Sequence, residues 1–125
     1  MTNEELKSRT KKFSISILNL VELLPNKVST RVVSNQISKS ATSVGVNYRA
    51  VCRSRSDKEF VSKMNIVLEE ADETLFWLEL IGEMNWIKKE EVQKIWLEGN
   101  ELTAIFVSSL KTINARLNLK SKTLN

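Results

Sequence analysis

Apolar side chains recur at steps of three and four residues along almost the whole chain, which is the spacing of amphipathic α-helices. Four separate stripes of this kind can be followed, each bounded by polar residues, Pro or Gly. They predict four helices, over about residues 3–24, 28–53, 57–84 and 89–118, and a flexible polar tail over 120–125.

Two of these helices begin with a sequence that can cap its own N-terminus. Thr2 with Glu5, and Ser56 with Glu59, have the spacing of capping boxes. The stripes then predict which side chains form the core. They are Leu6, Thr10, Phe13, Ile17, Leu20 and Leu24; Val33, Ile37, Ala41, Val44, Tyr48 and Val51; Phe60, Met64, Val67, Ala71, Leu75 and Leu78; and Val92, Trp96, Gly99, Leu102 or Thr103, Phe106, Leu110, Ile113 and Leu117.

Turn-forming residues are scarce, which favours a few long elements over many short strands. The chain has three glycines and one proline in 125 residues, and Pro25 separates the first two helices. Helices of similar length with short connections pack as an up-down-up-down bundle. The sequence therefore predicts an all-α, four-helix bundle as a single domain over 1–119. Gly45 and Gly99 lie inside helices, where we expect them to allow close packing.

The third predicted helix carries more apolar surface than one bundle needs. Four large apolar residues follow one another over 75–78, and neighbouring residues on a helix point about 100° apart. A helix on one side of a bundle needs a single apolar stripe. We therefore expect self-association into a homo-oligomer. The candidate interface residues are Phe76, Trp77, Leu80 and Trp96.

Basic and acidic residues are separated along the chain. Residues 27–63 hold eight Lys and Arg against two Asp and Glu, whereas residues 64–87 hold six acidic residues and no basic one. The turn between the second and third helices thus predicts a basic patch that can contact the phosphates of nucleic acid. Its candidate residues are Arg49, Arg53, Arg55, Lys58 and Lys63.

A second interpretation gives the same arginines a structural role. They could pair with acidic groups on a neighbouring helix or subunit, and the acidic run over 69–73 is the nearest candidate. Arginine near a helix C-terminus also complements the helix dipole. The basic stretch contains one aromatic residue, Tyr48, so it lacks the aromatic interleaving that single-strand binders use for base stacking.

Catalytic chemistry has few possible carriers in this sequence. Histidine is absent, which removes the common general base and the common zinc ligand, and the three glycines are too far apart to form a phosphate loop. We predict a non-enzyme with no catalytic, cofactor or metal site and no small-molecule substrate. Cys52 is the only cysteine, so it cannot form an internal disulfide. With an acidic N-terminus and no long apolar run, we expect a cytoplasmic protein without a membrane span.

The stretches over 40–50 and 53–60 together resemble the signature of the bacterial four-helix-bundle family, also called the 23S rRNA intervening-sequence proteins. That pattern has Ser-Val/Ile-x-x-Asn at the end of the second helix, a basic turn, and Ser-x-x-Glu-Phe at the start of the third. Here its places are held by Ser43, Val44, Asn47, Ser56, Glu59 and Phe60. Arg49 and Ala50 depart from it, because many members have Glu-Gly there.

The resemblance implies an up-down bundle that assembles as a homopentamer. It also implies two kinds of relative, some encoded within insertions in ribosomal RNA genes and others serving as accessory proteins that engage a reverse transcriptase and its RNA. Two hypotheses follow. In the first, the protein is an oligomeric adaptor whose basic patch binds a partner, which is RNA or a nucleic-acid enzyme such as a reverse transcriptase. In the second, the protein is a protein-only oligomeric scaffold.

Overall fold

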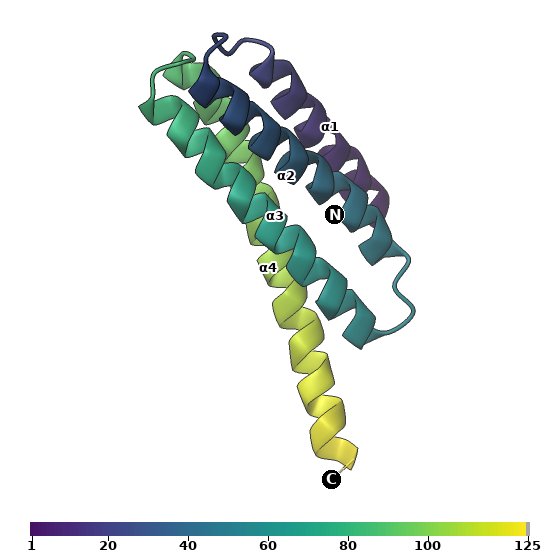
Figure 1. Ribbon diagram of the computed structural model, residues 1–125. Helices are drawn as coiled ribbons and strands as arrows, with labels where there is room; N and C mark the ends of the chain where they lie inside the picture. The colour runs from purple at the N-terminus through teal and green to yellow at the C-terminus, as the bar shows by residue number, and fades with distance from the viewer. Residues whose placement is uncertain (125) are drawn as a thin grey trace.

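A computed structural model describes residues 1–124, which form four α-helices and no strand. The helices are α1 (Asn3–Val21), α2 (Val28–Cys52), α3 (Asp57–Glu83) and α4 (Lys89–Leu124). Successive helices run in opposite directions, and α4 continues well past the start of α3 (Figure 1). The predicted all-α fold with four up-down helices is therefore confirmed for the described residues.

Local sequence accounts for where the helices begin and end. At the start of α1, Thr2 Oγ1 accepts a hydrogen bond from the Glu5 amide and Glu5 Oε2 accepts one from the Thr2 amide, both at 3.1 Å. At α3, Ser56 Oγ accepts from the Glu59 amide at 3.1 Å. Helix α3 ends before Asn85, whose φ of 57° lies in the left-handed region that Asn tolerates.

Two predicted helix ends differ from the structure. Helix α1 ends at Val21 rather than near residue 24, because the residue before Pro25 is disfavoured in the helical region. Helix α4 extends to Leu124 rather than 118, so residues 120–124 of the predicted loose tail are helical. Asn125 lies outside the described residues.

The predicted apolar stripes form the core. The inward positions of α2 are all buried, and Ile17, Val67 and Phe106 have no exposed surface. Among the predicted core residues, Leu24, Phe60, Trp96, Ile113 and Leu117 are only half-buried. Thr74 is a buried polar residue that is satisfied in the core: its Oγ1 donates to Ser40 Oγ on α2 and is also 2.8 Å from the Glu70 carbonyl. Trp77 Nε1 and Ser54 Oγ, in contrast, are buried atoms without a hydrogen-bond partner among the described residues.

Helix α1 is tied to α4 by a charged contact. The Arg9 guanidinium donates to both carboxylate oxygens of Glu98, at 2.5 and 3.1 Å, and lies 3.3 Å from Glu101. The hydrogen bond from Arg9 to Glu98 is the main reason that the pKa of Arg9 is raised. A forked pair of this kind fixes geometry as well as charge.

Two of the helical glycines have different surroundings, so replacing each with alanine should change stability in opposite directions. A Cβ added at Gly99 would lie 2.9 Å from Leu75 Cδ2 and 3.0 Å from the Phe13 ring, so Gly99→Ala would overpack the core. A Cβ at Gly82 would make ordinary contact with Val92 at 3.6 Å. We expect Gly99→Ala to lower the free energy of unfolding by roughly 1 kcal/mol, after about 1 kcal/mol gained in helix propensity.

Gly82→Ala is the matched control, and we expect it to raise stability by up to about 1 kcal/mol. Urea unfolding followed by circular dichroism measures both changes. Equal changes in the free energy of unfolding of the two variants would contradict the close approach of α4 to α1 and α3 at Gly99.

Candidate nucleic-acid interface

The turn between α2 and α3 presents three basic side chains to solvent. Helix α2 ends at Cys52, where the Arg53 amide bonds back to the carbonyls of Ala50 and Val51. After Ser54 and Arg55, Ser56 caps the N-terminus of α3, which begins at Asp57. The short turn leaves Arg53, Arg55 and Lys58 exposed, and the side chain of Arg55 has 90% of its surface open.

Glu59, in the first turn of α3, is an acidic group that contacts one of these basic side chains. Its carboxylate accepts a hydrogen bond from Lys63 Nζ at 2.7 Å and lies 3.8 Å from Arg55 Nε. The bond from Lys63 is the main reason that the pKa of Glu59 is lowered, and Arg55 adds to the effect. Lys63 is therefore directed along α3, whereas Arg53 and Lys58 have no ion pair within residues 1–124.

Helix α4 adds basic side chains that the patch prediction did not include. Arg116 donates to both oxygens of Asp57 at 2.8 and 2.9 Å, and Lys120 Nζ lies 3.6 Å from the same carboxylate. The hydrogen bond from Arg116 is the largest cause of the lowered pKa of Asp57. One carboxylate thus faces two cations, which leaves the site positively charged. The ion pairs of Asp57 with Arg116 and Lys120 are retained above the ordinary carboxyl pKa and are lost as pH falls through the lowered pKa of Asp57.

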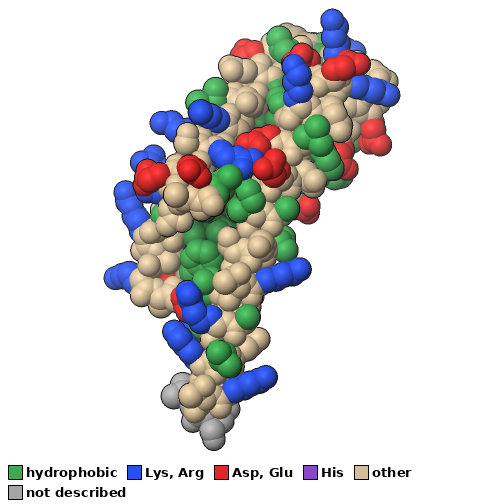
Figure 2. Space-filling view, turned by 180° about the vertical axis from the view of Figure 1, so that it is seen from behind, with side chains coloured by type: hydrophobic (Ala, Val, Ile, Leu, Met, Phe, Trp, Pro, Cys, Tyr) green, Lys and Arg blue, Asp and Glu red, His purple; other side chains and the backbone are tan. Residues whose placement is uncertain are grey.

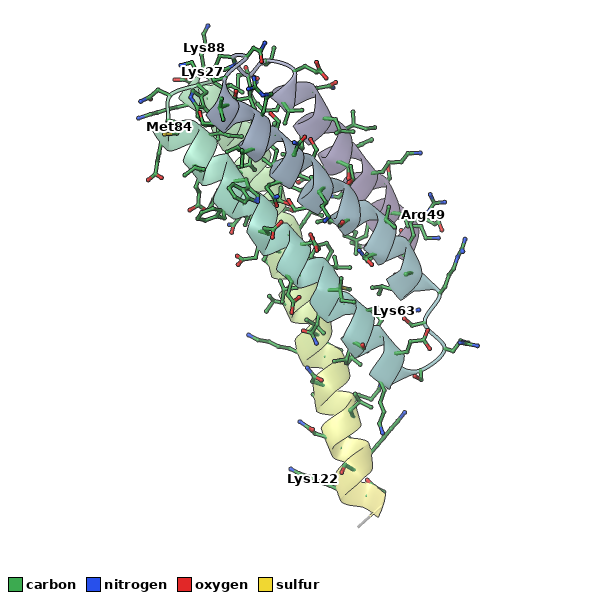
Figure 3. All side chains as sticks on the ribbon, viewed as in Figure 1. Lys27, Arg49, Lys63, Met84, Lys88 and Lys122 are labelled. Carbon is green, nitrogen blue, oxygen red and sulfur yellow. The ribbon has the colours of Figure 1, made fainter. Side chains whose placement is uncertain are left out.

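We call this surface the basic end. Its members come from α2, the following turn, α3 and the overhanging end of α4, and Figure 3 shows Arg49 and Lys63 near the turn with Lys122 at the tip of α4. In the space-filling view from behind, the charged side chains in the half of the molecule towards the tip of α4 are mostly blue (Figure 2). The basic end comprises Arg49, Arg53, Arg55, Lys58, Lys63, Arg116, Lys120 and Lys122.

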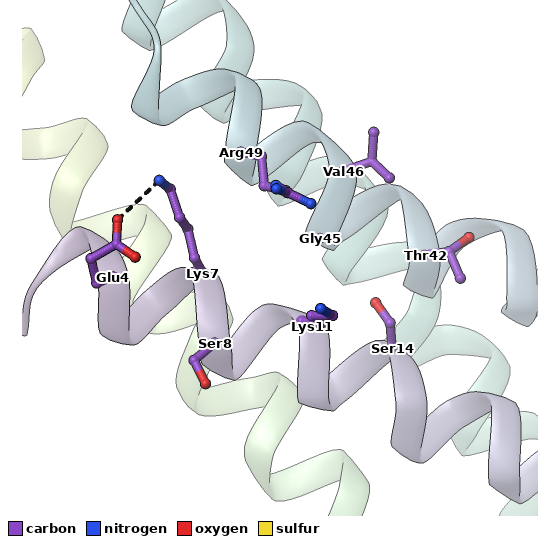
Figure 4. A pocket seen from close by; sticks show the side chains of 9 residues that line it. All are labelled: Glu4, Lys7, Ser8, Lys11, Ser14, Thr42, Gly45, Val46 and Arg49. Carbon is purple, nitrogen blue, oxygen red and sulfur yellow. Dashed lines mark hydrogen bonds and ion pairs between the residues drawn. The ribbon is translucent and has the colours of Figure 1, made fainter.

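Arg49 is separated in part from the other predicted patch residues. It lies one turn before Arg53 on α2 and lines a groove between α2 and α1, opposite Lys7 and Lys11 (Figure 4). The sequence prediction missed these two lysines. They are more than 35 residues away in the chain, and only the antiparallel packing of α1 on α2 brings them near Arg49.

The acidic run of α3 does not meet the basic end within one chain. Among the described residues, Glu69, Glu70, Asp72 and Glu73 form no ion pair. Burial raises the pKa of Glu70, and the nearby negative charge of Glu73 adds to the shift. Pairing between these carboxylates and the patch arginines inside one subunit is therefore wrong, and pairing between subunits stays a prediction.

The four predicted interface residues differ in exposure. Phe76 is 55% exposed, whereas Trp77, Leu80 and Trp96 are half-buried against the core. The Phe76 and Trp77 rings meet edge to face at 5.0 Å, and Trp96 Nε1 donates to Glu79 Oε2 at 3.0 Å. Large apolar side chains are exposed on the other helices too, among them Ile15, Leu18, Val28, Val32, Val46 and Leu97.

Comparison with known proteins identifies the group to which this bundle is related. The family model described as 23S rRNA-intervening sequence protein matches residues 3–108. The chain belongs to this family. The match includes α1, α2, α3 and the first part of α4, whereas residues 109–124 of α4 lie beyond it.

A similar protein whose structure is solved has a closely similar fold. It is a protein of the S23 ribosomal protein family from Bacteroides thetaiotaomicron VPI-5482, described as having unknown function. The two chains share 35% sequence identity with a TM-score of 0.79, and the alignment covers 85% of this chain and 98% of the relative. No curated protein matches this chain. Within residues 1–124, no helix is both long and apolar enough to cross a bilayer.

Proposed function

We propose that this member of the 23S rRNA-intervening sequence protein family is a non-enzymatic, homo-oligomeric bundle that binds RNA through its basic end. The observation that carries the proposal is the convergence of cations from α2, α3 and α4 on one end of the bundle, where Asp57 and Glu59 are their only ion-pair partners among residues 1–124. Arg53, Arg55 and Lys58 are the most accessible of these groups. Cations clustered in this way attract phosphates independently of sequence.

Self-association is the second part of the proposal. Exposed apolar side chains on every helix, Phe76 among them, provide surface that a partner subunit can cover. A ring of five subunits, as the family resemblance implies, would repeat the basic end five times. Linked weak sites bind a long RNA much more tightly than one site does, because later contacts form at a high effective concentration.

Salt-dependent RNA binding tests the role of the basic end. We expect a labelled single-stranded RNA to bind at low salt, with affinity falling steeply as salt rises because counterions are released. In the Arg53→Ala/Arg55→Ala variant, binding should weaken at every salt concentration. Since each phosphate contact contributes about 0.7 to the slope of log affinity against log salt, losing two contacts should reduce the slope by about 1.4 per site. Fluorescence anisotropy measures both quantities.

Lys88→Ala/Lys89→Ala is a matched control with the same change in net charge. Both lysines are exposed and lie at the opposite end of the bundle, where Figure 3 labels Lys88. This variant should keep nearly the wild-type slope. Absence of binding by the wild-type protein at low salt would overturn the proposed function.

A protein-only scaffold is the second candidate, and one observation favours it. Four of the basic side chains, Arg55, Lys63, Arg116 and Lys120, already contact Glu59 or Asp57. If the cations serve only to hold the end of the bundle together, the wild type will not bind RNA. Arg53→Ala/Arg55→Ala would then mainly lower the melting temperature or weaken the oligomer.

A further inference from the structure

The groove between α1 and α2 is a separate surface feature from the turn. It has a volume of about 540 Å³ and is lined on the α1 side by Lys7, Lys11 and Ser14 and on the α2 side by Thr42, Gly45 and Arg49. Figure 4 shows Arg49 and Thr42 on the upper helix, with Lys7 and Ser14 on the helix below them. The remaining lining residues are Glu4, Ser8 and Val46.

Small residues bring the two helices together at one end of this groove. Ser14 Oγ donates a hydrogen bond to the Ala41 carbonyl across the interface at 2.8 Å. Next to it, a Cβ added to Gly45 would lie 3.3 Å from Ser14 Oγ and 3.6 Å from the Thr10 carbonyl oxygen. The close approach fixes the floor of the groove, and the long side chains of Lys7, Lys11 and Arg49 form its walls towards the basic end.

The charge on these walls is positive. Lys7 Nζ lies 3.1 Å from Glu4 Oε1, so one cation of the groove is paired with the one carboxylate that lines it. Lys11 and Arg49 form no ion pair within residues 1–124. The helix dipole gives Arg49 a structural reason to lie in the last turn of α2. Lys11 lies in the middle of α1, so the dipole does not explain it.

We propose that this groove binds the backbone phosphates of a single RNA strand, extending the contact made by the basic end. The inference rests on the proposed function and identifies its ligand as single-stranded. Lys7 and Lys11 are four residues apart, which is about 6 Å along the helix axis and suits two successive phosphates of an extended strand. Arg49 can form a forked pair with a phosphate. A double helix is too wide for a groove between packed helices whose axes are about 8–10 Å apart.

Paired charge reversals test the groove. Lys11→Glu/Arg49→Glu places repulsive charge on both walls, whereas Lys12→Glu/Lys39→Glu makes the same net change at exposed positions on the same two helices outside the groove. We expect the groove variant to bind a labelled 12-nucleotide single strand at least tenfold more weakly than the control, with a salt slope about 1.4 lower than that of wild type. Circular dichroism melting checks that both variants fold. If either charge reversal prevents folding, Lys11→Gln/Arg49→Gln and Lys12→Gln/Lys39→Gln replace the pair, with the same direction expected.

The outcomes separate this inference from the proposed function. If wild-type protein binds RNA and Arg53→Ala/Arg55→Ala weakens it, but the groove variant matches its control, the groove assignment is overturned and the proposed function stands. Preferential binding of duplex over single-stranded RNA would also overturn it. Inorganic phosphate should not displace the strand when ionic strength is held constant, and displacement at millimolar phosphate would identify the groove as a site for a free phosphoryl group instead. No RNA binding by wild type overturns the proposed function itself.

Discussion

Phe76→Ser is expected to dissociate the oligomer at concentrations at which the wild-type protein stays assembled, while leaving each bundle folded. Phe76 leaves 55% of its surface exposed although it belongs to a run of four large apolar residues. Two members of that run, Leu75 and Leu78, are buried in the bundle, so removing the exposed ring should cost the monomer little. The loss should fall on the contact between subunits.

The size of this effect follows from apolar area. Covering the exposed half of a phenylalanine is worth about 1–1.5 kcal/mol, or roughly tenfold in affinity, at each contact. In a closed ring the loss recurs at every contact, so the total effect on assembly is several times larger. Size-exclusion chromatography with light scattering across a dilution series measures it.

Val32→Ser provides a control matched in exposure, because Val32 on α2 is also 55% exposed. It should leave the assembly closer to wild type than Phe76→Ser does. If the molecular mass of Phe76→Ser stays the same as that of wild type throughout the dilution series, the prediction that the α3 face lies in the subunit interface is contradicted. The predictions for Trp77, Leu80 and Trp96 would then lose their main support.

Phe106→Ala is expected to destabilise the fold by about 3–5 kcal/mol, the cost of truncating a large buried aromatic residue. Phe106 has no exposed surface, and its ring stacks on Tyr48 with centroids 6.0 Å apart and an angle of 28° between the planes. Tyr48 is itself buried, so truncating Phe106 would leave a cavity inside the core. Domains of this size are stable by about 5–15 kcal/mol, so much of the total would be lost.

Thermal unfolding should show this loss as a fall of roughly 10–20 °C in melting temperature. The control is Phe106→Leu, which keeps most of the volume and should cost clearly less. Both variants should be compared at one protein concentration, because assembly itself raises apparent stability. If Phe106→Ala lowers the free energy of unfolding by less than about 1 kcal/mol, the placement of Phe106 between α4 and α2 is contradicted.

Much of the fold could be predicted because a helical bundle is encoded by local periodicity. The stripe from Val33 to Val51 is buried at every predicted position, since a period of 3.6 residues places those side chains on one face of α2. The end of α4 could not be predicted in this way. Its last residues carry little apolar pattern. The helix there gains support from the contacts of Arg116 and Lys120 with Asp57, which lies about 60 residues earlier in the chain.

The candidate site was predicted less completely, for the same physical reason. Charge along the sequence identified Arg53, Arg55 and Lys58, which follow one another around a single turn. It did not identify Lys7 or Lys11, because these lysines are far from Arg49 in the sequence and only the packing of α1 on α2 brings them together. The up-down topology could have done so, since it places the start of α1 and the end of α4 beside the turn between α2 and α3.

Self-association is the central claim, because both the covered apolar surface and the multivalent RNA contact depend on it. Sedimentation velocity of the wild-type protein at micromolar concentration tests it most directly. We predict one dominant species whose mass is a multiple of 14.3 kDa, with five subunits as the multiple that the family resemblance implies. A single stable species of 14.3 kDa across the concentration range would contradict it.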